Sequence, residues 1–266
     1  MTHISKQYVH TSFGQIHLRK INAVNDQYPA LVCLHPAPSS GLYFTTVMPM
    51  LNTDRQVIAL DYLGYGGSAR QDVMPGIADY AAAMTEAISN LGIHEPYDLM
   101  GFHTGCLVAN EMALSQPELI RRLVLCDVPY FVADVRTSMQ EKFAQPMALT
   151  EDLQSIAEIW KFNVASRIGD VPIQRAVELL AEHLRTGDHD HFAFHAAFDY
   201  ACEERFAGLQ ANTTVIATQS AMLDPSRSAA EIIPGAQLVE ALEITTAVFE
   251  SGAQSIAARI ITALDA

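Results

Sequence analysis

The sequence predicts an α/β fold: a mostly parallel eight-stranded sheet flanked by helices, with a helical cap inserted after the sixth strand. Short apolar runs alternate with helix-period segments in the first half of the chain, which is typical of parallel strands covered by helices. The first two strands instead alternate polar and apolar residues about a short turn, as an antiparallel hairpin does. We expect residues 1–129 and 207–266 to form the core and residues 130–206 to form the cap.

The predicted hairpin pairs Lys6–Thr11 with Gln15–Ile21 and forms one edge of the sheet. The four strands that follow are short and almost wholly apolar, as expected for strands buried on both faces. These strands are Ala30–Leu34, Gln56–Leu60, Tyr97–Phe102 and Arg122–Cys126, and the helices between them are Leu42–Leu51, Asp79–Leu91 and Thr104–Ser115.

The alternation stops after Val128-Pro129-Tyr130, where the predicted cap begins. Helix-period stretches there are separated by glycine-containing breaks, and no convincing strand occurs before residue 207. The predicted cap helices are Thr150–Phe162, Val171–Leu184 and His191–Phe206, and the core resumes with strands Thr213–Thr218 and Gln237–Leu242 and a closing helix, Ser251–Leu264.

Composition limits the partners. The 266 residues are 50% hydrophobic and 17% charged, which suits one large core. A formal net charge of −14 opposes binding to nucleic acid or to an anionic membrane, so we expect a small-molecule substrate and leave a homodimer open.

The start of the chain has no apolar signal segment, and no run approaches the roughly 20 apolar residues of a membrane span, so we expect a cytoplasmic protein. The four cysteines are far apart and mostly in apolar surroundings, which predicts buried thiols and neither a disulfide nor a structural metal. They are Cys33, Cys106, Cys126 and Cys202.

The segment from Tyr97 to Asn110 is the most informative in the chain. A short apolar run leads into Gly-Phe-His-Thr-Gly and then into a helix, with His103 at the apex of the turn. Glycines on both sides relieve crowding at such a strand-to-helix turn, which exposes the apex side chain above the sheet.

Two further motifs follow earlier strands. Residues 34–38 read Leu-His-Pro-Ala-Pro, so Ala37 supplies the only backbone N–H between two prolines. Residues 61–68 read Asp-Tyr-Leu-Gly-Tyr-Gly-Gly-Ser, a glycine-rich turn whose simplest role is structural.

In this order and spacing, the three motifs resemble those of the α/β-hydrolase superfamily, whose G-x-S-x-G elbow carries a nucleophilic serine. His103 stands where that serine would be. The resemblance implies oxyanion donors at the amides of Ala37 and Thr104 and an acid at Asp224, which would otherwise begin a helix. Asp127 is a second candidate for the acid, because some relatives place it after the sixth strand.

The family's histidine base has no counterpart here. It should follow the eighth strand, but no histidine occurs after His195, and Thr246 occupies the corresponding position. A serine-type relay therefore cannot be assembled from the usual positions.

Three interpretations of His103 follow. It acts as a base or nucleophile in hydrolysis of a small, fairly apolar ester, lactone or related carbonyl compound. Alternatively, it abstracts a proton in lyase, isomerase or C–C cleavage chemistry, or it only contacts a ligand in a catalytically degenerate member of the fold. None of these interpretations requires a cofactor.

Several other residues are candidates for contact with substrate. His191 and His195 are four residues apart in a histidine-rich stretch, but the stretch lacks a metal signature, so we expect no metal there. We expect the His195 side chain to point from the cap towards the substrate. The remaining candidates lie beside the motifs or in the cap: His35, which more simply braces its loop, Ser39, Phe102, Asp127, Trp160 and Thr246.

Overall fold

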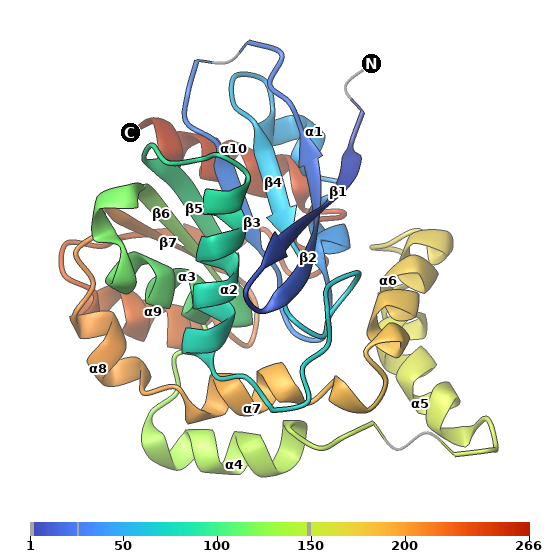
Figure 1. The fold of residues 1–266 in the computed structure, drawn as a ribbon. Coiled ribbons are helices and arrows are strands. Elements are labelled where there is room, and N and C mark those ends of the chain that lie inside the picture. The colour runs from blue at the N-terminus through green and yellow to red at the C-terminus, as the bar shows by residue number, and fades with distance from the viewer. Residues whose placement is uncertain (1–2, 26, 148–149) are drawn as a thin grey trace.

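A computed structural model describes residues 3–25, 27–147 and 150–266 (Figure 1). Its eight strands form one sheet in the order β1-β2-β4-β3-β5-β6-β7-β8. β1 and β2 pair antiparallel, β2 pairs antiparallel with β4, and every other pair is parallel, so the predicted fold class is confirmed. The strands are β1 (Ser5–Thr11), β2 (Gly14–Ile21), β3 (Leu31–Leu34), β4 (Val57–Leu60), β5 (Tyr97–Phe102), β6 (Ile120–Cys126), β7 (Thr213–Thr218) and β8 (Gln237–Ala241).

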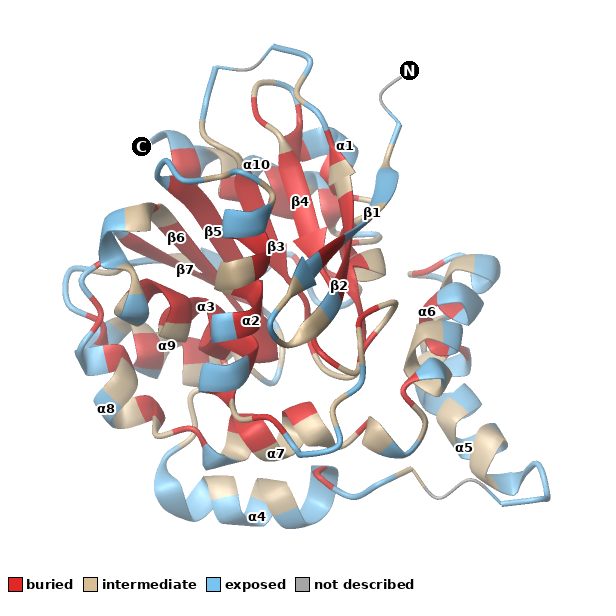
Figure 2. Cartoon of the chain, in the orientation of Figure 1, coloured by how far each residue is buried: buried red, intermediate tan, exposed pale blue. Residues whose placement is uncertain are grey.

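Helices cover both faces of the sheet, which explains the apolar character of the central strands. Every residue of β3, β4, β5 and β7 is buried (Figure 2). Most of the edge strand β8 is not. Helices α2 (Ile77–Asn90), α3 (Thr104–Ser115) and α9 (Leu223–Ile232) pack into one hydrophobic cluster, and α1 (Met48–Leu51) and α10 (Ala253–Asp265) pack into the other.

The single helix predicted over residues 42–51 is wrong. The structure has a 3₁₀ turn, η1 (Gly41–Phe44), followed by the short α1. The Ser40 side chain accepts a hydrogen bond from the Leu42 amide and so starts η1. The intervening Thr45, Thr46 and Val47 are β-branched and disfavour a continuous helix.

In the described residues, five α-helices lie between β6 and β7. We keep the name cap for residues 130–206, although the last of these helices ends at Ala207. The predicted helix over residues 191–206 is interrupted at Tyr200, whose backbone is extended. Figure 1 shows α4 and α7 beneath the carboxyl ends of the strands, while α5 and α6 project to one side. The helices are α4 (Ala133–Phe143), which the sequence did not predict, α5 (Gln154–Asn163), α6 (Ile173–Arg185), α7 (Phe192–Asp199) and α8 (Cys202–Ala207), with 3₁₀ turns η3 (Ala165–Arg167) and η4 (Gly187–His189).

Candidate functional site

His103 sits in a strained turn between β5 and α3. Its backbone has φ 49° and ψ −119°, a conformation that non-glycine residues rarely adopt. Glycine is required on both sides: a Cβ at Gly101 would lie 2.3 Å from the Gly105 carbonyl oxygen, and one at Gly105 would lie 2.1 Å from the Leu34 carbonyl oxygen. The tight packing of α3 on β5 and β3 therefore fixes this elbow, residues 101–105.

The His103 imidazole lies in an environment that favours its neutral form. Its ring is 4.1 Å from that of Phe102, and the residue is only partly exposed. Desolvation lowers the pKa of His103 below its usual 6.5, and the nearby charge of Asp127 raises it only in part. A neutral imidazole at neutral pH is able to accept a proton.

Asp127 is the carboxylate that the structure places near His103. It directly follows β6, has φ 50° and is fully buried. Its two oxygens accept hydrogen bonds from the Thr218 amide (2.7 Å) and the Thr218 hydroxyl (2.6 Å), which join the ends of β6 and β7. These bonds satisfy an ionised carboxylate and hold it in place.

Asp224 is placed differently from the family's acid. It lies in the first turn of α9, with its side chain 86% exposed and 2.9 Å from Arg227. Within the described residues its carboxylate makes no bond to His103, and the residue before α9 is Met222, so Asp224 is not its N-cap. In the described residues neither carboxylate bonds the His103 ring, but Asp127 follows Cys126, whose carbonyl accepts a hydrogen bond from the His103 amide (3.2 Å), and its charge is the one that acts on the imidazole.

The two predicted oxyanion amides lie on adjoining segments. Thr104 opens α3, Ala37 lies in the turn after β3, and the close approach of Gly105 to the Leu34 carbonyl joins these segments. In the described part of the chain neither amide donates a hydrogen bond to another protein group. Free amides at a helix start and an adjacent turn are suited to an anionic oxygen.

His35 serves the loop and not the substrate. It is fully buried, its Nδ1 donates to the Pro36 carbonyl (2.9 Å), and its Nε2 accepts from the Tyr62 amide (3.1 Å). Burial lowers the pKa of His35 to about 4, so the ring is neutral and both nitrogens are engaged. This placement is incompatible with the predicted contact of His35 with substrate.

Asp61 organises the glycine-rich turn. Its buried carboxylate accepts hydrogen bonds from the Gly41 and Gly67 amides and from the side chains of His17 and Arg19. Burial alone would raise the pKa of Asp61, but the His17 hydrogen bond and the charge of Arg19 outweigh it and lower that pKa. The role of this turn in the structure is to brace the start of η1 beside the site.

The remaining residues predicted to contact substrate lie in different surroundings. Trp160 is 39% exposed on the projecting α5, so the structure gives no support to its role as a pocket wall. His195 accepts a hydrogen bond at Nδ1 from Gln140 of α4 (3.0 Å). Thr246 is exposed, and its neighbour Ala247, with φ 43°, packs against the cap instead. Ser39 is buried beside the Ala37 turn.

Three residues of the segments around the elbow, Tyr43, Arg175 and Glu250, were not predicted from the sequence. Tyr43 of η1 stacks on Phe102 at 5.6 Å, so Phe102 lies between Tyr43 and His103. Arg175 of α6 binds Glu250 of the loop after β8 (2.8 Å) and the Leu42 carbonyl (2.8 Å). These residues come from segments far apart in the sequence and share no motif, so no sequence signal singled them out.

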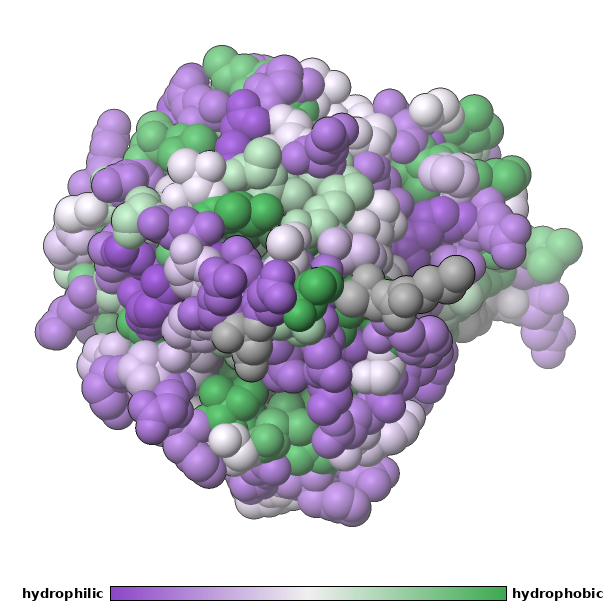
Figure 3. All heavy atoms as spheres, turned by 90° about the horizontal axis from the view of Figure 1, so that it is seen from above, coloured by the Kyte–Doolittle hydropathy of each residue, from purple (hydrophilic) through white to green (hydrophobic). Residues whose placement is uncertain are grey.

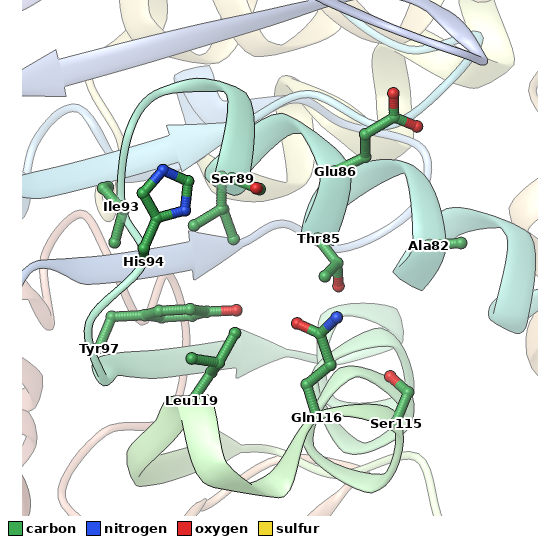
Figure 4. A pocket seen from close by; sticks show the side chains of 11 residues that line it. Ala82, Thr85, Glu86, Ser89, Ile93, His94, Tyr97, Ser115, Gln116 and Leu119 are labelled. Atoms are coloured by element: carbon green, nitrogen blue, oxygen red, sulfur yellow. The ribbon is translucent and has the colours of Figure 1, made fainter.

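Two cavities lie elsewhere on the protein. One, of about 470 Å³, lies between α2 and the start of β5 and is lined by Thr85, His94, Tyr97 and Gln116 among others (Figure 4). The other, of about 510 Å³, is lined by residues 168–173 of the cap. Neither is lined by His103.

Among residues 3–25, 27–147 and 150–266, no group of three or more histidine, cysteine or acidic side chains is arranged to hold a metal ion. No helix in these ranges has both the length and the apolar character to cross a bilayer. The four cysteines are buried free thiols.

Comparison with known proteins identifies the family. A family model described as alpha/beta hydrolase fold matches residues 29–228. The chain belongs to the α/β-hydrolase family. Two solved structures have a similar fold over almost the whole length of the chain. A hydrolase from Pseudomonas aeruginosa PA01 superimposes with a TM-score of 0.81 and 20% identity, covering 98% of this chain and 99% of that one. An enol-lactonase from Burkholderia xenovorans LB400 superimposes with a TM-score of 0.77 and 17% identity, covering 98% of this chain and 100% of that one.

Matches to curated relatives are shorter. A fluoroacetate dehalogenase from Burkholderia sp. is 31% identical over 105 residues, 38% of this chain and 34% of that protein. A pyrrolizixenacetamide deacetylase from Xenorhabdus hominickii is 27% identical over 129 residues, 48% of each chain. The chain thus matches only a third to a half of the length of these relatives.

Proposed function

We propose that this protein is a cofactor-independent hydrolase of a small, fairly apolar ester, lactone or related carbonyl compound, with His103 as general base. The observation that carries the proposal is the position of His103: it occupies the strained apex of the elbow, within the electrostatic influence of the buried Asp127. Relatives named as a dehalogenase, a deacetylase and an enol-lactonase support hydrolysis on this fold.

In the proposed reaction the substrate carbonyl oxygen accepts hydrogen bonds from the amides of Ala37 and Thr104. Neutral His103 removes a proton from water as the water oxygen attacks the carbonyl carbon, and Asp127 stabilises the imidazolium that forms. Collapse of the tetrahedral intermediate breaks the bond to the leaving alcohol, which receives the proton from His103. The net reaction converts the ester and one water molecule into a carboxylic acid and an alcohol.

The nucleophilic variant is less well supported. An acyl-imidazole on His103 would need a second group to activate the water that hydrolyses it. The acidic group whose charge acts on His103 is Asp127, and the Thr218 amide and hydroxyl already donate to its two oxygens. The geometry therefore favours His103 as a base.

Lyase or isomerase chemistry is the second candidate. It is favoured by the absence of any histidine after His195, which leaves His103 as a lone base able to remove a proton from a substrate carbon. Product analysis distinguishes hydrolysis from lyase or isomerase chemistry. Hydrolysis in ¹⁸O-labelled water incorporates the label into the acid product, whereas proton abstraction alone does not.

The experiment compares wild type with His103→Gln and Asp127→Asn on short aryl esters and lactones between pH 5 and 9. We expect His103→Gln to lose at least about 100-fold in kcat/KM, the usual contribution of a general base. Asp224→Asn is the matched control, and it should retain the wild-type rate because that carboxylate is exposed and bound to Arg227.

The pH profile adds a second readout. The wild-type rate should rise with pH through the lowered pKa of His103, below 6.5, and then level off. Asp127→Asn removes the charge that raises this pKa, so its profile should shift to lower pH while the plateau falls. If His103→Gln retains its rate, or Asp224→Asn mimics Asp127→Asn, the proposed site is wrong.

A further inference from the structure

The cavity between α2 and the start of β5 lies at the opposite end of that strand from His103 (Figure 4). Tyr97 begins β5 and lines the cavity, whereas His103 follows Phe102, the last residue of β5. The six residues of the strand, at about 3.3 Å each, span roughly 20 Å. The cavity, of about 470 Å³, is therefore separate from the elbow and has a size that suits a small molecule.

Most of the polar side chains that line this cavity have no hydrogen-bond partner in the protein. Two are engaged: Glu86 accepts a hydrogen bond from the Ser12 amide (2.7 Å), and the Ser115 hydroxyl donates to the Glu111 carbonyl (2.9 Å). Within residues 3–25, 27–147 and 150–266, the side chains of the other five make no hydrogen bond. These five are Thr85, Ser89, His94, Tyr97 and Gln116.

Tyr97 is the most buried of these five residues, at 2% exposure. Its hydroxyl is not among the buried polar atoms that are sealed off without a partner, so it opens to the cavity. Figure 4 shows this hydroxyl directed into the space between Thr85 and Gln116. Burial raises the pKa of Tyr97, so the hydroxyl keeps its proton at neutral pH and is able to donate a hydrogen bond to a ligand.

Gln116 presents the second directed polar group. Its backbone is held at the end of α3, because its amide donates to the Met112 carbonyl (3.0 Å) and its carbonyl accepts from the Leu119 amide (3.1 Å). Its side chain is half-buried and points into the cavity opposite Thr85 (Figure 4). A carboxamide carries an acceptor and a donor side by side, so a ligand satisfies both only if it carries a matching pair.

The charge of the cavity disfavours an anionic ligand. In the described part of the chain, no lysine or arginine lines it. Hydrogen bonds from the Ser12 hydroxyl and amide lower the pKa of Glu86, so this carboxylate is negative at neutral pH. The rest of the lining includes apolar side chains, among them Ile88, Ile93 and Leu119, against which a flat apolar group is able to pack.

We propose that this cavity binds a small, neutral, planar amide of the aromatic carboxamide class. The ligand carboxamide exchanges two hydrogen bonds with the Gln116 side chain, one in each direction, and the Tyr97 hydroxyl donates to a further acceptor of the ligand. The aromatic ring lies on the apolar part of the lining. This binding is independent of the proposed hydrolysis, because none of the lining residues belongs to the elbow.

The first test compares two probes of the same shape, nicotinamide and 3-acetylpyridine, by NMR titration of the protein. The second probe keeps the carbonyl and the ring nitrogen but has a methyl group in place of the NH₂, so it leaves the Gln116 side-chain oxygen without a donor. We expect wild type to bind nicotinamide at least about fivefold more tightly, because one hydrogen bond is lost.

Variants assign this preference to named side chains. Gln116→Met has a similar length but no amide, and it should bring the ratio of the two affinities close to one. Tyr97→Phe should weaken both probes by a similar factor, because both keep the ring nitrogen. Gln210→Met is the matched control and should keep the preference: Gln210 is exposed, and its side chain makes no hydrogen bond to other described residues.

The same titration locates the probe. Backbone amide signals of residues 85–97 and 115–119 should shift while those of residues 101–105 do not, and His103→Gln should bind nicotinamide as tightly as wild type. Hydrolysis can therefore fail without affecting this test. The inference is overturned if wild type does not bind nicotinamide, if it binds both probes equally, if Gln116→Met retains the preference, or if the shifts are confined to the elbow.

Discussion

The carboxyl end of the sheet and the cap hold their polar side chains by different means. At the sheet, His103 and Asp127 both have positive φ, and backbone groups of neighbouring strands fix them. In the cap, Arg175 reaches the core through an ion pair with Glu250. Side chains fixed by backbone geometry can be recognised in a sequence from the neighbouring glycines and strand ends. Side chains fixed by contacts between long side chains leave no such sequence pattern.

The two regions also differ in how much hydrophobic surface they bury. The sheet lies between two large clusters, whereas the buried part of the α5–α6 cluster is four small or medium side chains: Val164, Val171, Ala176 and Leu180. Hydrophobic side chains remain exposed around α5 and α6, including Leu153 (79%), Phe162 (74%) and Ile168 (71%). Figure 3 shows hydrophobic residues at this projecting end. We therefore expect α5 and α6 to open before the core unfolds.

The largest predicted effect concerns a core glycine. Gly105→Ala would force a Cβ to 2.1 Å from the Leu34 carbonyl oxygen, in backbone that cannot move without displacing β3. We expect a loss of at least about 3 kcal/mol in the free energy of unfolding, measured with urea. The matched control is Gly169→Ala in the cap: nothing lies within 4 Å of that Cβ, and only its φ of +102° is strained, so the loss should be about 1 kcal/mol.

If Gly169→Ala is as damaging as Gly105→Ala, the cap is as rigidly packed as the elbow and the comparison fails.

The second effect is acid sensitivity of the core. Because the pKa of His35 is about 4 in the folded protein and near 6.5 when unfolded, the unfolded state binds a proton first as pH falls. Stability should therefore be retained above pH 6.5 and lost between 6.5 and 4, by up to about 3 kcal/mol at 1.36 kcal/mol per pKa unit. His103 acts in the same direction.

Urea unfolding at several pH values measures this dependence. His35→Asn, which retains a donor for the Pro36 carbonyl, should be less stable at pH 7 but flatter between pH 6.5 and 4. An unchanged slope in this variant would exclude His35 as the source.

The third effect should be confined to the cap. Glu250→Gln leaves the largely buried Arg175 with only its longer pair to the half-exposed Glu178 (3.4 Å), which we expect to cost about 2 kcal/mol. The readout is faster hydrogen exchange in α5 and α6, with α2 and α3 unchanged. Glu243→Gln, in an exposed pair with Arg259, is the control and should leave hydrogen exchange unchanged in all four helices. Faster exchange throughout the core would show that the cap is not a separate unit of stability.

The sequence predicted most of the strands and the elbow for identifiable reasons. Short apolar runs mark strands buried on both faces, and Gly101 and Gly105 mark a turn that admits no Cβ. The sequence ranked Asp224 above Asp127 because both carboxylates appear available in sequence and the family pattern favours the first. Only the structure shows that Asp224 is exposed and paired with Arg227, three residues further on, and that Asp127 is bonded to Thr218. Arg175 was missed because its contacts with Glu250 and Leu42 depend on the docking of the cap.

The smallest predicted effect tests the loop after β8, where core and cap meet. Thr246→His restores a histidine at the position of the family's base, but the side chain there is exposed and Ala247 turns towards the cap. The new imidazole should therefore not reach Asp127, and we expect kcat/KM within twofold of wild type and stability within about 0.5 kcal/mol. Ester hydrolysis and urea unfolding measure both. A tenfold rise in rate that requires Asp127 would show that the loop moves into the site, and His103 would then share the role of base with a second region of the chain.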